Sequence, residues 1–171
     1  MADRSRLARF APTFALVLLF GCDDGGLSEA ADRSEAATRQ GDFAAARLWA
    51  ERAAERAEAK YGADHFKTAT ALTLVGETHL ARRAYGAAEA PLARALAICE
   101  KRFGAGDARA QETRAALAEA LTDQAVEAMA AERWAEAEAM LQRLAQIAAA
   151  GSDEAAAVQD ALATVRGRRV K

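Results

Sequence analysis

The residues that could carry chemistry in this sequence are few: two histidines, two cysteines and many scattered carboxylates. A metal site needs several such ligands close together, and the sequence has only two histidines, His65 and His79. The sequence contains no G-x-S-x-G, H-E-x-x-H, Walker or dinucleotide-binding glycine motif. Cys99 lies in an apolar stretch, ALAICEK, and is expected to be a packed thiol. The sequence therefore predicts a protein without enzymatic activity, cofactor or metal.

Residues 1–21 have the layout of a secretory signal peptide. Three arginines precede an apolar run of 11 residues, Phe10–Phe20, and Asp23-Asp24 follow it. As a helix this run would span roughly 16 Å, about half of the hydrocarbon core of a bilayer. We therefore expect export, and we do not expect a membrane-spanning anchor.

The end of this segment, Leu19-Phe20-Gly21-Cys22, resembles the lipobox of bacterial lipoproteins. The resemblance implies that Cys22 becomes the lipid-modified first residue of the mature protein and that its acyl chains tether it to a membrane. The alternative is an ordinary signal peptide cut nearby, which leaves Cys22 as a free thiol. Asp23 resembles an inner-membrane retention signal. The expected location is the periplasmic face of a bacterial membrane, with the inner membrane slightly favoured.

The composition of the chain favours helices with small side chains. Apolar residues make up 52% of the 171 residues, mostly as alanine, and aromatic residues only 6%. Alanine is the best helix former and fills little volume, so closely packed helices are expected in place of a large aromatic core. The formal net charge is −2. The one basic cluster, Arg166–Lys171, is interpreted as a frayed end, and nucleic-acid binding is not predicted.

An internal repeat organises the rest of the chain. Phe43 and Tyr85 lie 42 residues apart, and so do Tyr61 and Phe103. A third copy begins at Trp134, which follows Tyr85 by 49 residues. The spacing exceeds 42 by seven residues, which is close to two helical turns. A helix lengthened by two turns keeps its buried face in the same direction.

Each copy is expected to form two helices, because apolar residues recur at spacings of three and four. In the breaks Gly62-Ala63-Asp64 and Gly104–Asp107, glycine is expected to end a helix and aspartate to cap the next one. An alanine-rich coiled coil would need unbroken heptads, which these breaks exclude. The expected helices are 27–40, 43–61, 66–82, 85–103, 108–131 and 134–149, with a seventh after Gly151-Ser152.

These residues resemble the tetratricopeptide repeat. Gly76, Tyr85, Ala88 and Ala95 fit its pattern in register, and the second copy is similar to the 42-residue variant typified by kinesin light chain. The resemblance implies an all-α fold, a short right-handed α-solenoid of about three helix-turn-helix repeats with a C-terminal capping helix. The expected divisions are a signal peptide (1–21), a linker (22–26), repeats over 27–149 (27–64, 65–107 and 108–149), and a capping helix with basic tail (150–171).

The resemblance also implies a concave groove, lined by the first helix of each pair, that binds a protein partner. It also implies structural roles for both histidines: His65 caps or braces a turn, and His79 stands inside a helix pair. The kinesin-light-chain variant holds the backbone of a peptide with a pair of asparagines. In this sequence Thr73 and Leu74 occupy the two positions, so that clamp is missing. A mildly acidic, partly apolar groove would suit a helix or a basic segment. Its candidate residues are Glu35, Thr38, Thr70, Thr73, Glu77, Glu119, Thr122, Val126 and Met129.

Two functions follow from this interpretation. The first is a membrane-tethered adaptor or scaffold of the bacterial cell envelope that binds a protein partner through the groove. The alternative is a structural subunit that self-associates or docks through its convex or edge surfaces in a larger assembly. Trp49 lies on a second helix, so its exposure should favour the alternative and its burial the groove.

Overall fold

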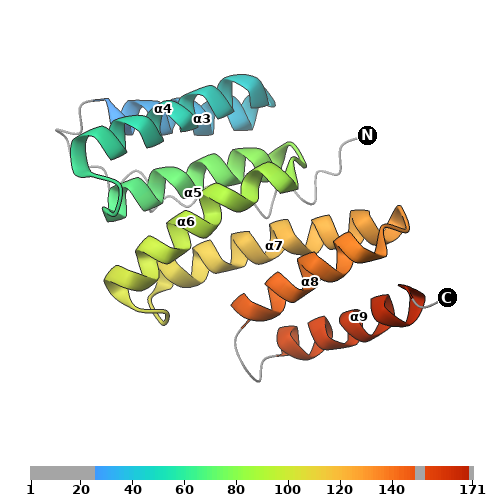
Figure 1. Ribbon diagram of the computed structural model, residues 1–171. Helices are drawn as coiled ribbons and strands as arrows, with labels where there is room; N and C mark the ends of the chain where they lie inside the picture. The colour runs from blue at the N-terminus through green and yellow to red at the C-terminus, as the bar shows by residue number, and fades with distance from the viewer. Residues whose placement is uncertain (1–25, 149–152, 170–171) are drawn as a thin grey trace.

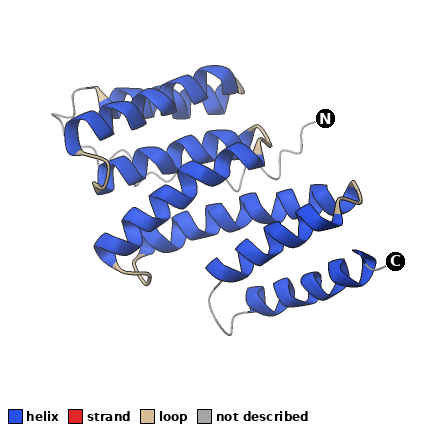
Figure 2. Cartoon of the chain, viewed as in Figure 1, coloured by secondary structure: helices blue, strands red, loops and turns tan. Residues whose placement is uncertain are grey.

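The structure is a computed structural model that describes residues 26–148 and 153–169, and all regular structure in these residues is helical (Figure 2). Its helices are α3 (Leu27–Gln40), α4 (Phe43–Tyr61), α5 (Phe66–Ala81), α6 (Tyr85–Phe103), α7 (Ala108–Ala130), α8 (Trp134–Ile147) and α9 (Asp153–Arg169). The expected helix boundaries agree to within two residues. The expected signal peptide and Cys22 lie outside the described residues.

The helices pack in the order of the sequence, as three antiparallel pairs followed by α9 (Figure 1). The pairs are α3 with α4, α5 with α6, and α7 with α8, and each pair contacts the next. The first helices also contact one another, α3 with α5 and α5 with α7. The fold is therefore the expected all-α stack of tetratricopeptide-like helix pairs.

The turn inside each pair has the same backbone geometry, whatever residue occupies it. Gly41, Arg83 and Glu132 all have positive φ values of 78°, 59° and 57°. The residue that follows each of them donates its N–H to a carbonyl five residues earlier, as in Asp42 to Ala37. This is the usual left-handed termination of a helix, for which glycine is best suited. The sequence signals it only in the first pair, where the residue is glycine.

The turns between pairs end and begin helices as expected, with one exception. Gly62 and Gly104 end α4 and α6, and the side chain of Asp107 accepts the N–H of Arg109 at the start of α7. The predicted cap of α5 by Asp64 is wrong. The Nδ1 atom of His65 accepts the N–H of Lys67, because His65 is the residue directly before the helix. Asp64 instead forms an ion pair with Lys101.

Small residues let the helices approach closely. A Cβ atom at Gly76 would lie 2.4 Å from the Leu92 side chain, so α5 and α6 meet where Gly76 has no side chain. Tyr85, Ala88 and Ala95 are buried on the facing side of α6. Between α3, α4 and α5 the core consists largely of alanine, with Leu27, Leu74 and Val75 among its few larger members. The first pair is therefore packed with less apolar volume than the second and third.

The third pair is lengthened in its first helix. α7 has 23 residues and α5 has 16, and the C-terminal end of α7 extends past the turn that joins α5 to α6 (Figure 1). Beyond it, α9 covers α8 with Val158, Leu162 and Val165, all buried. The expected fraying of the basic tail is wrong for Arg166, which lies in α9 and forms an ion pair with Glu138 of α8.

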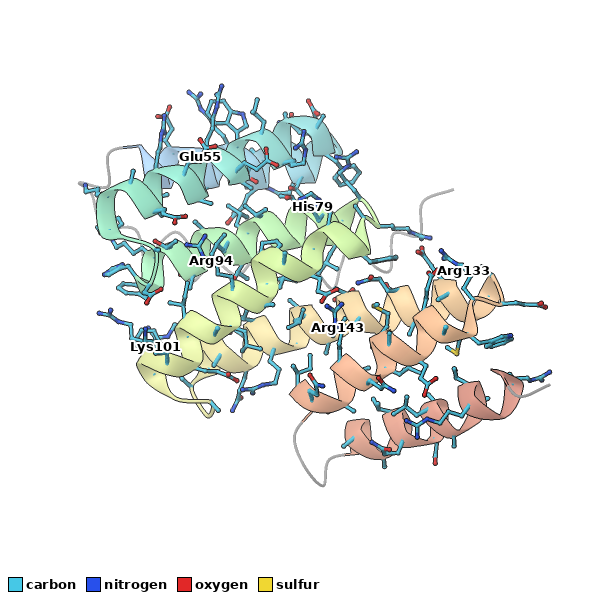
Figure 3. All side chains as sticks on the ribbon, viewed as in Figure 1. Glu55, His79, Arg94, Lys101, Arg133 and Arg143 are labelled. Carbon is cyan, nitrogen blue, oxygen red and sulfur yellow. The ribbon has the colours of Figure 1, made fainter. Side chains whose placement is uncertain are left out.

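Further ion pairs join second helices across pairs. Arg94 of α6 binds Glu58 of α4 through two nitrogens, at 2.8 and 3.1 Å, and Arg143 of α8 binds Glu89 of α6 at 2.7 Å (Figure 3). All four side chains are partly exposed, so solvent screens both ion pairs and each contributes little to stability. Within the described residues, no helix is both long enough and apolar enough to cross a membrane.

Candidate functional site

The candidate site is the face formed by the first helices, α3, α5 and α7, which we call the concave face. The residues expected to line it come from all three: Glu35 and Thr38 from α3, Thr70, Thr73 and Glu77 from α5, and Glu119, Thr122, Val126 and Met129 from α7. The residues of α3 and α5 in this set are half-buried. Each helix therefore contributes polar side chains that are partly open to solvent.

Glu77 stands at the centre of the concave face. The pKa of its carboxyl is raised to about 7, chiefly by burial and in smaller part by the like charges of Glu35 on α3 and Glu112 on α7. Burial and the nearby Asp32 also raise the pKa of Glu35. Glu35 and Glu77 lie 42 residues apart on α3 and α5, and α5 contacts both α3 and α7, so carboxylates of successive pairs lie on one face. Within the described residues, no basic side chain forms an ion pair with Glu77.

The threonines of the concave face have their hydroxyl hydrogens engaged. Thr38 donates to the carbonyl of Ser34 at 2.9 Å, Thr70 to that of Phe66 at 3.0 Å and Thr73 to that of Ala69 at 3.1 Å. A hydroxyl has a single hydrogen, so each of these groups offers only acceptor lone pairs to a ligand. On α3 and α5, the concave face therefore presents acceptors and negative charge.

The structure does not bring all the expected residues into one compact site. Val126 and Met129 lie in the part of α7 that extends beyond α5, because the end of α5 corresponds to Asp123 in the 42-residue register. Val126 is 51% exposed, whereas Met129 packs partly against the core. Glu119 and Thr122 are exposed on α7. Val126 and Met129 therefore form an extension of the concave face beyond α5, whereas Glu119 and Thr122 lie within the 42-residue register that α7 shares with α5.

Sequence reasoning missed Glu112. It occupies in the third copy the place that Thr70 has in the second, 42 residues earlier. Glu35, Glu77 and Glu119 are related by the same spacing. Applying this spacing to Thr70 as well would have found Glu112, because equivalent positions of successive repeats share a face.

The histidines have structural surroundings. The ring of His65 stacks on that of Tyr61, with centroids 5.0 Å apart, while its Nδ1 caps α5. Burial lowers the pKa of both histidines. His79 faces α4, where Arg47 and Glu51 act on it (Figure 3), and its Nδ1 has no hydrogen-bond partner within the described chain. Cys99 is buried, and burial raises the pKa of its thiol. Such a thiol is mostly protonated and poorly nucleophilic at neutral pH.

Trp49 is neither fully exposed nor fully buried. Its ring packs partly against the core of the first pair, and the guanidinium groups of Arg33 and Arg52 lie 4.5 and 4.9 Å from its ring centroid. The neighbouring Leu48 is 45% exposed. The outer side of α4 thus carries an apolar residue beside an indole covered by cations.

Two other kinds of candidate site are a metal site and a cavity. Among the described residues, no group of three or more His, Cys, Asp or Glu side chains is arranged to hold a metal ion. A cavity of about 520 Å³ lies between the α6–α7 turn and the C-terminal end of α8. Its charged groups satisfy one another, because Arg114 pairs with Glu100 and donates to the carbonyl of Ala105.

Comparisons with known proteins agree with this architecture. Residues 27–101 match the family model described as tetratricopeptide repeat. Among solved structures, BtubC (BKLC) from P. vanneervenii is similar, with a TM-score of 0.51 and 17% sequence identity over 84% of this chain and 56% of that one. The chain thus spans little more than half the length of that structure, and a likeness at this identity shows the fold alone. No curated protein matches the sequence.

Proposed function

Because residues 27–101 match the tetratricopeptide repeat family and the helix pairs are stacked as in such repeats, we propose that this chain is a non-catalytic adaptor or scaffold that binds a protein partner through the concave face. The family binds proteins and is typically non-catalytic. The observation that carries the proposal is that Glu35 and Glu77 are half-buried at equivalent positions of α3 and α5, first helices that contact each other. Glu112 of α7 adds a further carboxylate that acts on Glu77. Aligned side chains from several repeats form the extended surface on which repeat proteins hold a partner.

A pull-down from membranes with the full-length chain tests this function. The charge reversals Glu77→Lys and Glu119→Lys alter equivalent positions of the concave face on α5 and α7. Glu55→Lys makes the same change at an exposed position of α4 and serves as the matched control (Figure 3). We expect the partner to be lost with the first two variants and retained with the third. Retention after both concave substitutions would rule out binding through this face.

The adaptor is proposed to act at the periplasmic face of a bacterial membrane, tethered through a lipid on Cys22. Support comes from the sequence Leu19-Phe20-Gly21-Cys22 after an apolar run and three arginines. The Asp23 that follows favours the inner membrane slightly.

The tether predicts the behaviour of Cys22→Ser. The variant should leave the membrane fraction or accumulate uncleaved, because the acyl chains that hold the protein can no longer be attached. Fractionation of cells followed by immunoblotting measures both outcomes, with Cys99→Ser as the control. Unchanged membrane association and maturation would contradict lipidation.

The second candidate function is a structural subunit that self-associates or docks through other surfaces. The exposed Leu48 beside Trp49 on α4 favours it. In that case Leu48→Glu should lower the sedimentation coefficient of the purified full-length chain, and Glu77→Lys should leave it unchanged. A monomeric wild type would exclude self-association.

A further inference from the structure

The chemistry of the concave face around Glu77 indicates what kind of partner it fits. The hydroxyls of Thr38, Thr70 and Thr73 donate to carbonyls of their own helices, so they can only accept hydrogen bonds from a ligand. The carboxylates of Glu35 and Glu77 likewise only accept when they are ionised. A partner must therefore bring the donors.

The charge of this region is equally one-sided. The groups that act on Glu77 are the carboxylates of Glu35 on α3 and Glu112 on α7. On the opposite side of α5, His79 faces Arg47 and Glu51 of α4, and burial keeps this histidine uncharged near neutral pH. Among the described residues, the charged groups that shift the pKa of Glu77 come from α3 and α7, and none comes from α6. An acidic segment would be repelled here, and a neutral one could donate hydrogen bonds to Glu77 but would leave its negative charge uncompensated.

We propose that the concave face binds a cationic segment of its protein partner, whose lysine or arginine side chain pairs with Glu77 between Glu35 and Glu112. This inference rests on the proposed function, because it names the chemistry of the partner at the same face. A half-buried carboxylate gives a charge-assisted hydrogen bond that is stronger than one at a fully solvated position. The nearby threonine oxygens accept further N–H groups of the same side chain or of the partner's backbone.

Such binding depends on pH. The pKa of Glu77 is raised to about 7, so the free protein is mostly protonated at this position at pH 6 and mostly ionised at pH 8. The ionised form is the one that pairs with a cation, and binding therefore releases a proton. We expect affinity for the cationic segment to rise by up to about tenfold from pH 6 to pH 8.

The partner is unidentified, so the test uses a phage-displayed library of random 12-residue peptides selected against the full-length chain at pH 8. We expect the selected peptides to share a lysine or arginine at one fixed position. Selection against Glu77→Lys should lose this consensus, and selection against Glu55→Lys should keep it. A synthetic consensus peptide, followed by fluorescence anisotropy, should bind Glu77→Gln about tenfold or more weakly, and its remaining affinity should no longer rise between pH 6 and pH 8.

The outcomes separate this inference from the function on which it rests. An apolar or acidic consensus that is lost with Glu119→Lys would overturn the cationic segment and leave binding through the concave face intact. A lysine consensus whose affinity is unchanged in Glu77→Gln would also overturn it. No enrichment at all, or a consensus that survives both Glu77→Lys and Glu119→Lys, would overturn both proposals. Circular dichroism of each variant checks that it is folded.

Discussion

At the scale of the residue, Glu77 lowers the stability of the free protein and is proposed to bind the partner in the complex. Its half-buried carboxylate, with two others acting on it, has no ion-pair partner in the described chain, and these surroundings raise its pKa. A side chain of this kind is unfavourable for folding unless protonation or a partner neutralises it. The same group therefore links stability, pH and binding.

The link gives a prediction about stability. The folded-state pKa of about 7 lies above the ordinary value of 4.5, so the folded chain holds a proton that the unfolded chain releases between these values. This contribution is fully present below about pH 4.5 and is lost as the pH rises through 7. Glu77→Gln removes the dependence. From pH 5 to pH 8 the free energy of unfolding of the wild type should fall by on the order of 1–2 kcal/mol more than that of the variant.

Urea denaturation followed by circular dichroism at both pH values measures this difference. Glu55→Gln, at an exposed position of α4, is the matched control and should follow the wild type. Parallel pH profiles of the wild type and Glu77→Gln would show that Glu77 is not strained in the folded protein.

Gly76 is a second residue whose surroundings make a sharp prediction. An added Cβ would lie 2.4 to 3.0 Å from three atoms of the fully buried Leu92. Gly76→Ala should destabilise the chain by about 1–3 kcal/mol through overpacking, although alanine is the better helix former by about 1 kcal/mol. The denaturation midpoint measures this, with Gly86→Ala as a control, because its Cβ meets nothing closer than 3.7 Å. A more stable Gly76→Ala would mean that α6 can move away without cost.

At the scale of the element, the three turns inside the pairs show how one backbone geometry accepts different residues. Gly41, Arg83 and Glu132 occupy equivalent left-handed positions. A residue with a Cβ pays roughly 1–2 kcal/mol for this conformation. The chain has an ideal residue at one of the three turns and tolerates strain at the other two.

Arg83→Gly should therefore stabilise the protein by about 0.5–1 kcal/mol, since the relief of strain exceeds the added flexibility of the unfolded chain. The neighbouring Arg82 has φ −89°, a conformation that suits any residue, so Arg82→Gly should not stabilise. Thermal unfolding of the two variants side by side measures the difference. Equal melting temperatures for both would argue against a strained turn at Arg83.

At the scale of the whole molecule, the stack is covered at its C-terminal end by α9. Val158, Leu162 and Val165 are buried, and Arg166 holds Glu138 of α8 at 2.9 Å. A terminal helix of this kind is needed because each pair of a repeat protein leaves one apolar side for its neighbour to cover. The cap therefore contributes to the stability of the third pair as well as its own.

Leu162→Ala should accordingly cost about 2–3 kcal/mol of unfolding free energy. Thr164 is exposed and does not belong to the buried side of α9. Thr164→Ala should therefore change stability by less than about 0.5 kcal/mol. Urea denaturation of both variants provides the measurement. A neutral Leu162→Ala would mean that α9 is not a cap on which α8 depends.

Much of the fold could be predicted because it depends on local sequence. Helix boundaries follow from glycine breaks, apolar spacing and the repeat, so they agree to within two residues. Gly76, Tyr85, Ala88 and Ala95 are buried as the tetratricopeptide resemblance implies. The cap at His65 agrees with the resemblance, whereas the general preference for aspartate at a helix start pointed wrongly to Asp64. The left-handed turn at Arg83 was less predictable, since position relative to the helix end outweighs residue preference there.

The sequence by itself determined the number of helices, their pairing and the face of each that is buried, because these depend on periodicity along the chain. Only the tertiary structure decided that Glu35, Glu77 and Glu112 form one charged cluster while Val126 and Met129 lie apart on the extension of α7. It also decided that Trp49 is covered by two arginines. The physical reason is that the pKa of a carboxyl and the cover over an indole depend on neighbours that other helices supply across the stack.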